Sequence, residues 1–151
     1  MDNPVKQQLH AFCQAYIGDR LSRIQKNIAA LQEALNSETK SSAGDKHETG
    51  RAMIQLEREK LGKQLAEVQL LQELFKKVPL RSGYSTIALG NLVYTPEQNF
   101  YLGISAGELK IDGVSFYAIA PNTPIGKLLL GKGKGDVVIF NSREIKILEI
   151  H

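Results

Sequence analysis

The chain has 151 residues, of which 42% are hydrophobic and 23% are charged, and its formal net charge is +3. This composition is typical of a globular protein with one ordinary or two small domains, and no apolar run approaches the ~20 residues that a membrane span needs. The mild positive charge is shared between the two halves of the chain, which argues against autonomous binding to nucleic acid. The single cysteine excludes an internal disulfide and a cysteine-rich zinc site.

The first residues, MDNPVKQQLHAF, lack the charged and apolar regions of a signal peptide. We therefore expect a cytoplasmic protein with no membrane partner. The one cysteine, Cys13, is expected to be a buried small hydrophobic residue rather than a reactive thiol.

Two segments with helical periodicity make up residues 1–78. In the first, apolar residues recur at alternating steps of four and three from Val5 to Leu35, with a one-residue shift after Tyr16; in the second, the pattern resumes after Gly50. This spacing is typical of a heptad seam, and the polar stretch 36–44 between the segments predicts a turn. We therefore predict an antiparallel coiled-coil hairpin, roughly 40–50 Å long at 1.5 Å per residue, with an acidic tip near residues 37–50.

No further long helix follows to complete a bundle, which favours a hairpin that projects towards another molecule. Pro79 predicts the end of the second helix, and the spacing in residues 79–151 is that of strands with turns at Asp112-Gly113 and Asn141-Ser142. Residues 123–131 interrupt the strands as a short helix entered through Pro124. The fold class is therefore α+β, with a small antiparallel sheet packed against one short helix.

Two acidic residues, Asp45 and Glu48, open the second helix in the stretch GDKHETG. Aspartate at the N-cap with glutamate three residues later is close to a capping box. Two carboxylates at the end of a rod can also help to hold a divalent cation and a water, and the two interpretations are compatible. His47 has no histidine or cysteine near it in sequence, so we interpret it as a solvated side chain.

The glycine-rich stretch GKGKGD, residues 131–136, lacks the Gly-Lys-Ser/Thr ending of a phosphate loop and precedes a strand rather than a helix. It is predicted to be a flexible turn with Lys132 and Lys134 in solvent. No Ser/His/Asp or Cys/His set suggests itself among the three histidines, so we do not expect a self-sufficient hydrolase.

The heptad hairpin, the Gly-Asp-x-x-Glu tip and the later segment NTPIGKLLLGKGKGDVV together resemble the Gre transcript-cleavage factors of bacteria over nearly the whole chain. The resemblance implies a coiled coil over residues 1–78 and an FKBP-like domain over residues 79–151. It further implies a monomeric elongation factor that binds RNA polymerase, inserts its coiled coil into the secondary channel and stimulates the polymerase's own Mg²⁺-dependent cleavage of backtracked transcripts. Such a protein is not itself an enzyme and has no cofactor or metal of its own; its partners are RNA polymerase and the 3′ end of the nascent RNA.

The positions that match the family's motifs carry the implied roles. Asp45 would be the principal carboxylate assisting the polymerase-bound Mg²⁺, and Glu48 would orient or support the attacking water. The polymerase-docking loop would be Asn122, Thr123, Pro124 and Ile125. The candidates for contact with RNA are Lys40, Lys46, Arg51 and Arg58.

Two alternatives stay open. One is a Gre-like regulator that occupies the secondary channel without stimulating cleavage. The other is a prolyl-isomerase or chaperone module, suggested by the FKBP-like half; isomerases of that fold have an aromatic-lined pocket usually floored by tryptophan, and this chain has no tryptophan.

Overall fold

The computed structural model describes residues 3–40, 44–80 and 85–151, with side chains over 3–37, 49–80 and 85–151. The fold is α+β, with two long helices followed by small sheets. It divides into two compact units: Ile17–Gln72, called here the helical unit, and Met1–Tyr16 with Glu73–His151, called the sheet unit. The division crosses both long helices, whereas the change from helix to strand along the chain falls near Pro79, where the sequence predicts it.

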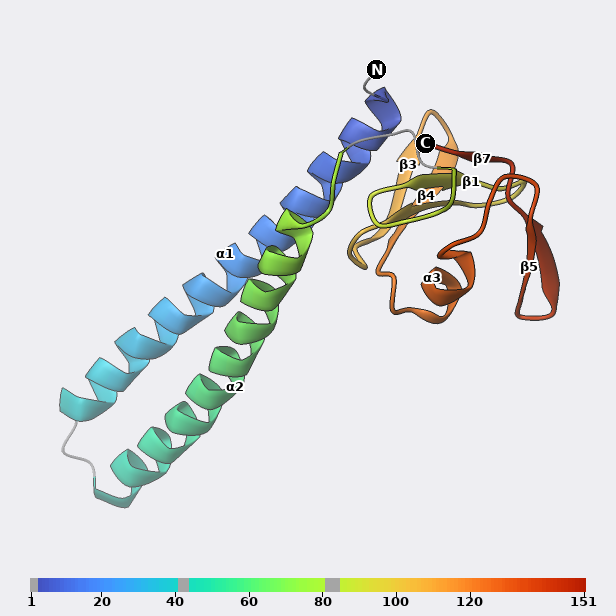
Figure 1. The fold of residues 1–151 in the computed structure, drawn as a ribbon. Coiled ribbons are helices and arrows are strands. Elements are labelled where there is room, and N and C mark those ends of the chain that lie inside the picture. Colours follow the sequence, from blue (N-terminus) through green and yellow to red (C-terminus); the bar gives the residue numbers. More distant parts are fainter. Residues whose placement is uncertain (1–2, 41–43, 81–84) are drawn as a thin grey trace. The chain divides into compact units, whose positions relative to one another are not determined.

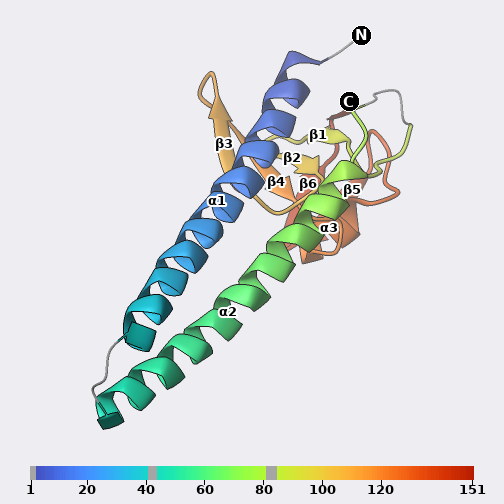
Figure 2. The same ribbon diagram turned by 90° about the vertical axis from the view of Figure 1, so that its left-hand side faces the viewer.

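The helical unit consists of most of α1 (Pro4–Lys40) and α2 (Gly44–Lys76), which run side by side in opposite directions in both views (Figures 1 and 2). The predicted hairpin is therefore present, but α1 continues through residues 36–40, which were predicted to be part of the turn. Extending an existing helix adds one hydrogen bond for each residue that is fixed, and this stretch contains no proline or glycine to stop it. Within the described residues, no helix combines the length and the apolar content that a membrane span needs.

The seam of the helical unit is buried at Ile24, Leu61 and Val68. Ile28 and Ile54 are only half-buried and line a small cavity of about 50 Å³. A seam between two helices is covered from one side only, so its side chains keep partial access to solvent unless both partners are large.

The sheet unit contains a five-stranded sheet in the order β3-β4-β2-β1-β7 and a separate hairpin, β5-β6. Their bounds are β1 Leu92–Tyr94, β2 Asn99–Leu102, β3 Gly107–Ile111, β4 Val114–Ile119, β5 Val137–Phe140, β6 Arg143–Lys146 and β7 Glu149–Ile150, with the short helix α3 at Pro124–Leu129.

The larger sheet is mixed, because β2 and β4 pair in parallel while the other neighbours are antiparallel. The prediction of a wholly antiparallel sheet is therefore wrong at this pair. The chain leaves β2 for the edge strand β3, turns back through Asp112 and Gly113, and inserts β4 between them, so β4 runs in the direction of β2. Both turn residues have positive φ, 51° and 80°, as a tight hairpin requires.

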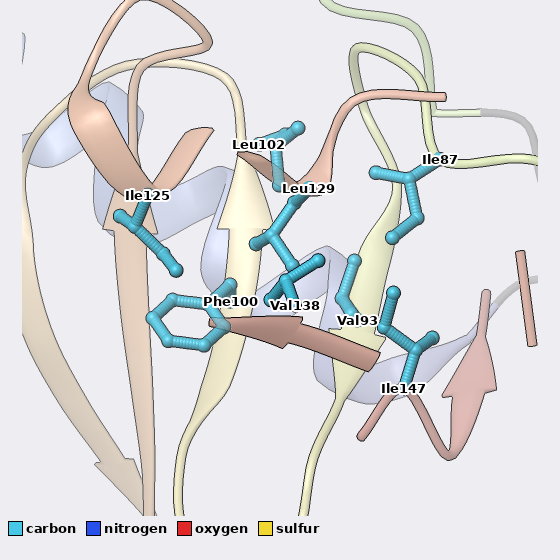
Figure 3. Packing of buried hydrophobic residues seen from close by; sticks show 8 residues of the cluster. All are labelled: Ile87, Val93, Phe100, Leu102, Ile125, Leu129, Val138 and Ile147. Carbon is cyan, nitrogen blue, oxygen red and sulfur yellow. The ribbon is translucent and has the colours of Figure 1, made fainter. Parts of the chain in front are cut away.

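One face of this sheet carries the main hydrophobic core. Val93, Phe100 and Leu102 from β1 and β2 meet Ile125 and Leu129 from α3 (Figure 3). Val138 and Ile147 close the same cluster from the β5-β6 side. The core thus holds α3 against the sheet and positions the turn that precedes it.

The opposite face of the sheet meets the helical residues of the sheet unit. Leu9 and Cys13 are fully buried there, and His10 Nδ1 lies 3.2 Å from the hydroxyl of Tyr101. The ring of His10 also packs on Phe75 of α2, with 4.5 Å between ring centroids. Since this part of α1 packs on the sheet as well as on α2, its apolar positions are displaced from the simple seam, which explains the one-residue shift in the heptad pattern. The predicted burial of Cys13 is confirmed.

Candidate functional site

The segment predicted to dock on a partner forms a tightly bonded turn into α3. Thr123 is the N-cap: its Oγ1 accepts from the backbone N–H of Gly126 at 3.1 Å and donates to the carbonyl of Ala120 at 2.7 Å. Pro124 occupies the first turn of the helix, where its missing N–H costs no hydrogen bond. The short helix predicted through Pro124 is confirmed. Its start is stabilised by the Thr123 hydroxyl, which acts as both donor and acceptor.

The four predicted docking residues divide by exposure. Asn122 and Pro124 are exposed, and Thr123 is half-buried with its hydroxyl already engaged. Ile125 is buried in the core beneath α3. A buried side chain cannot contact a rigid partner directly, so Ile125 anchors the segment while Asn122 and Pro124 are presented to solvent.

Gly126 explains why this turn needs its particular sequence. A Cβ atom at this position would lie 2.4 Å from the carbonyl oxygen of Ala120 and 2.9 Å from that of Pro121. Both distances are shorter than real Cβ contacts, so only glycine lets the turn close on the first turn of α3. The backbone at Asn122 and Pro124 is therefore pre-formed.

The glycine-rich stretch after α3 is a hydrogen-bonded turn. Asp136 Oδ2 accepts from the N–H of Gly133 at 2.7 Å, and the N–H of Gly131 bonds the carbonyl of Ile87 at 2.8 Å. The turn and the exposure of Lys132 and Lys134 are confirmed, and the flexibility expected of this turn stays a prediction. The backbone donors used in these bonds cannot also form a phosphate cradle.

The predicted catalytic pair lies at the start of α2. The backbone helix begins at Gly44, so Asp45 and Glu48 are inside the first turns of the helix, and Asp45 does not hold the N-cap position that a capping box requires. An aspartate in the first turn, two residues beyond the N-cap position, generally still interacts favourably with the helix dipole. The side chains of Asp45 and Glu48, and those of the RNA-contact candidates Lys40 and Lys46, lie outside the described residues.

The two remaining RNA-contact candidates are described. Arg51 and Arg58 are exposed on α2, and their seven-residue spacing places them on one side of the helix, about two turns apart. Arg58 also lies beside Ile28 and Ile54 at the small cavity of the helical unit. Its aliphatic stem therefore covers the seam while its guanidinium can reach solvent.

A buried polar cluster in the sheet unit was not predicted. Lys6 is 1% exposed, and its Nζ donates to the carbonyl of His151 at 3.3 Å; the amide of the fully buried Asn91 donates to the same carbonyl at 3.1 Å. Burial lowers the pKa values of Lys6 and His10 and raises that of Tyr101. Burial likewise raises the pKa of Cys13 to about 12, so its thiol stays protonated and inert near neutral pH. These groups tie the ends of the helices to the sheet.

A second feature missed in the sequence is a cleft of about 530 Å³ in the sheet unit, between the β1-β2 turn and the β5-β6 hairpin. The turn signals at residues 96–98 and at Asn141-Ser142 pointed to this region, but they predicted the strand connections rather than the cleft. Among the side chains described, no three histidine, cysteine, aspartate or glutamate residues gather as a possible metal site.

Comparison of the chain with protein-family models finds no match, and comparison with curated proteins likewise finds none.

Proposed function

We propose that the protein is a Gre-like transcription elongation factor, which binds bacterial RNA polymerase and stimulates cleavage of backtracked transcripts by inserting its helical hairpin into the secondary channel. The observation that carries the proposal is one combination within a single chain. Two uninterrupted helices form a hairpin, the second begins with Gly44-Asp45-x-x-Glu48, and a pre-formed Asn122–Ile125 turn follows in the sheet unit.

The hairpin suits a role in reaching a recessed site. Its arms within the helical unit are about 35–45 Å long at 1.5 Å per residue. Asp45 and Glu48 are three residues apart on a helical backbone, so they are neighbours on one side of α2. Carboxylate oxygens are the ligands that Mg²⁺ prefers, and Mg²⁺ keeps several waters when protein supplies only one or two of them.

In this proposal Asp45 and Glu48 would assist a Mg²⁺ ion that belongs to the polymerase. That ion lowers the pKa of a bound water and stabilises charge on the phosphate. The chain's own contribution is to bring two carboxylates to the site on a helix. Asp45 would be the principal carboxylate assisting the ion, and Glu48 would orient or support the attacking water.

Docking would use the exposed part of the turn before α3. Asn122 offers an amide donor and acceptor, and Pro124 offers a rigid apolar surface. Because Thr123, Ile125 and Gly126 hold the backbone in place, binding would not require ordering of this segment. We also propose that residues 79–151 form an FKBP-like domain, and the short helix α3 packed on a small sheet supports this.

The proposal is tested by RNA shortening in purified, backtracked elongation complexes with Mg²⁺. Asp45→Asn and Glu48→Gln should each lower the cleavage rate by about tenfold or more while binding to polymerase is unchanged, because both variants keep size and remove charge. Glu59→Gln, which removes an exposed carboxylate from the middle of α2, is the control and should cleave at the wild-type rate.

Equal shortening by wild type and both tip variants would refute the assignment of the acids. Binding of the wild type without Mg²⁺-dependent shortening would favour the non-catalytic regulator instead. Pro124→Ala should weaken binding and leave the helical signal unchanged, and unaltered binding would exclude the Asn122–Ile125 turn as the docking element.

A further inference from the structure

The 530 Å³ cleft lies between the β1-β2 turn and the separate β5-β6 hairpin. One wall is the turn Thr95–Gln98, and the other is the end of the β5-β6 hairpin, with Phe140 and Ile145 half-buried inside it. The volume is within the range of small-ligand and peptide sites.

The turn that forms the first wall is rigid. Thr95 Oγ1 hydrogen-bonds to both the carbonyl and the N–H of Gln98, and the N–H of Thr95 bonds Asn99 Oδ1 at 3.2 Å. Pro96 further restricts the backbone between them. The cleft therefore has one wall that does not need to be ordered when something binds.

The second wall presents a strand edge. The residues Asn141 and Ser142 have φ of 51° and 63° and close a two-residue turn between the paired residues Phe140 and Arg143. In such a hairpin the pair next to the turn is hydrogen-bonded, and hydrogen-bonded and non-hydrogen-bonded pairs then alternate. The backbone groups of Glu144 and Lys146 thus point away from β5.

An independent hydrogen bond shows towards which side they point. Downstream of β6, the N–H of Leu148 donates to the carbonyl of Tyr94 in β1 at 2.8 Å. The N–H of Ile147 donates to the backbone carbonyl of Asp136, on the opposite side of the strand. Backbone N–H groups alternate with a period of two along a strand. The backbone N–H groups of Lys146 and Glu144 therefore face the same side as the N–H of Leu148. On that side β1 ends, the Thr95–Gln98 turn begins, and the cleft opens.

We propose that this cleft binds an extended peptide segment, which adds as an antiparallel strand to the edge of β6 that no described strand pairs with. A residue of the peptide would exchange two backbone hydrogen bonds with Glu144, in the β-strand addition that exposed sheet edges permit. Its two neighbours would direct their side chains into the cleft, against Phe140 and Ile145, and are therefore apolar.

Charge at the cleft selects the central residue of the peptide. Two of the three charged lining residues are acidic, Glu97 and Glu144. The residue opposite Glu144 lies on the same face of the strand as its carboxylate, so a basic side chain fits there. Arg143 reaches across to Glu97, with 3.5 Å between Nη1 and Oε2, but the two side chains are 78% and 80% exposed. Such a pair is weak and can open to admit a peptide.

The test uses the ¹⁵N-labelled full chain and three acetylated, amidated peptides: Ser-Val-Arg-Val-Ser, its Glu-centred counterpart, and the Arg peptide with an N-methyl group on the central amide. The Arg peptide should shift the amide signals of Glu144 and Lys146 and slow their hydrogen exchange. The amide of Ile145, which already faces β5, should be protected before and after addition. The Glu-centred peptide should bind about tenfold more weakly, and the N-methylated peptide should not bind.

Two variants sharpen the result. Glu144→Gln should weaken binding of the Arg peptide about threefold, whereas Glu73→Gln, at an exposed acid of α2 outside the cleft, should not change it. Several outcomes would overturn the proposal: no shifts at millimolar peptide, equal binding of the N-methylated peptide, or equal binding of the Arg and Glu peptides. Concentration-dependent shifts at β6 without peptide would show that a second copy occupies the edge, which also overturns it.

Discussion

Replacement of Gly126 by alanine tests whether the turn before α3 is as closely packed as its geometry indicates. In an ordinary helix this change stabilises by up to about 1 kcal/mol, because alanine has the higher helix propensity. Here the added Cβ would lie 2.4 Å and 2.9 Å from two carbonyl oxygens and 2.9 Å from Thr123 Oγ1. The steric effect should therefore decide the sign.

The expected magnitude follows from two contributions. Overpacking of a closed site typically costs about 1–3 kcal/mol, and displacement of the N–H that Thr123 Oγ1 accepts loses an N-cap interaction of about 1 kcal/mol. Together they predict that Gly126→Ala lowers the unfolding free energy of the sheet unit by about 2–4 kcal/mol. This corresponds to a fall in its melting temperature of more than about 8 °C.

The assay is urea unfolding followed by tyrosine fluorescence, since the four tyrosines among the described residues (Tyr16, Tyr94, Tyr101 and Tyr117) lie in the sheet unit and the chain has no tryptophan. Gly62→Ala is the matched control: the site is in the middle of α2, is exposed, and a Cβ there meets no atom within 4 Å. That variant should be more stable by about 0.5–1 kcal/mol when α2 is followed by circular dichroism. Unchanged or increased stability of Gly126→Ala would refute the reasoning.

Three further predictions concern the sheet unit. Thr123→Ala should lower its unfolding free energy by about 1 kcal/mol, whereas Thr123→Ser, which keeps the capping hydroxyl, should lose much less; equal losses in urea unfolding would contradict the cap. Because burial raises the pKa of Cys13 to about 12, the native protein should not react with a disulfide reagent at pH 8, and one thiol should appear in denaturant; rapid native labelling would show that the site opens. Burial lowers the pKa of His10 in the folded state, so the unfolded chain binds this proton more readily and stability should fall as pH drops below about 6.5. His10→Gln should reduce the fall in unfolding free energy below about pH 6.5, and an unchanged fall would assign it to other groups.

Local patterns in the sequence predict the features whose causes are local. The heptad spacing predicts both helices, Pro79 predicts the end of α2 near Lys76, and Pro124 predicts the start of α3. The Asp112-Gly113 turn is found as predicted, because residues that accept positive φ are needed wherever two strands join through two residues. Each of these depends on a few neighbouring residues and little else.

Features that depend on distant residues were not predictable in this way. The parallel β2-β4 pair arises from the order in which strands are inserted into the sheet, which no local period encodes. Lys6 is buried against a carbonyl that lies 145 residues away along the chain, and no local pattern in the sequence indicates that burial. Ile125 was predicted to belong to the docking loop, and the structure places its side chain in the core beside Phe100 and Leu102 of β2, which the sequence did not indicate.

The candidate sites show the same division. The sequence predicts that two acidic residues, Asp45 and Glu48, lie at the start of a helix, and they do. Their role in assisting a metal ion and a water stays a prediction. The cleft beside β6 could not be inferred from sequence, because it exists only where the Thr95–Gln98 turn and the β6 edge separate after the chain has folded. Side-chain chemistry and local periodicity belong to neighbouring residues and can be read from the chain, whereas burial, strand order and open edges are set by contacts between residues far apart in it.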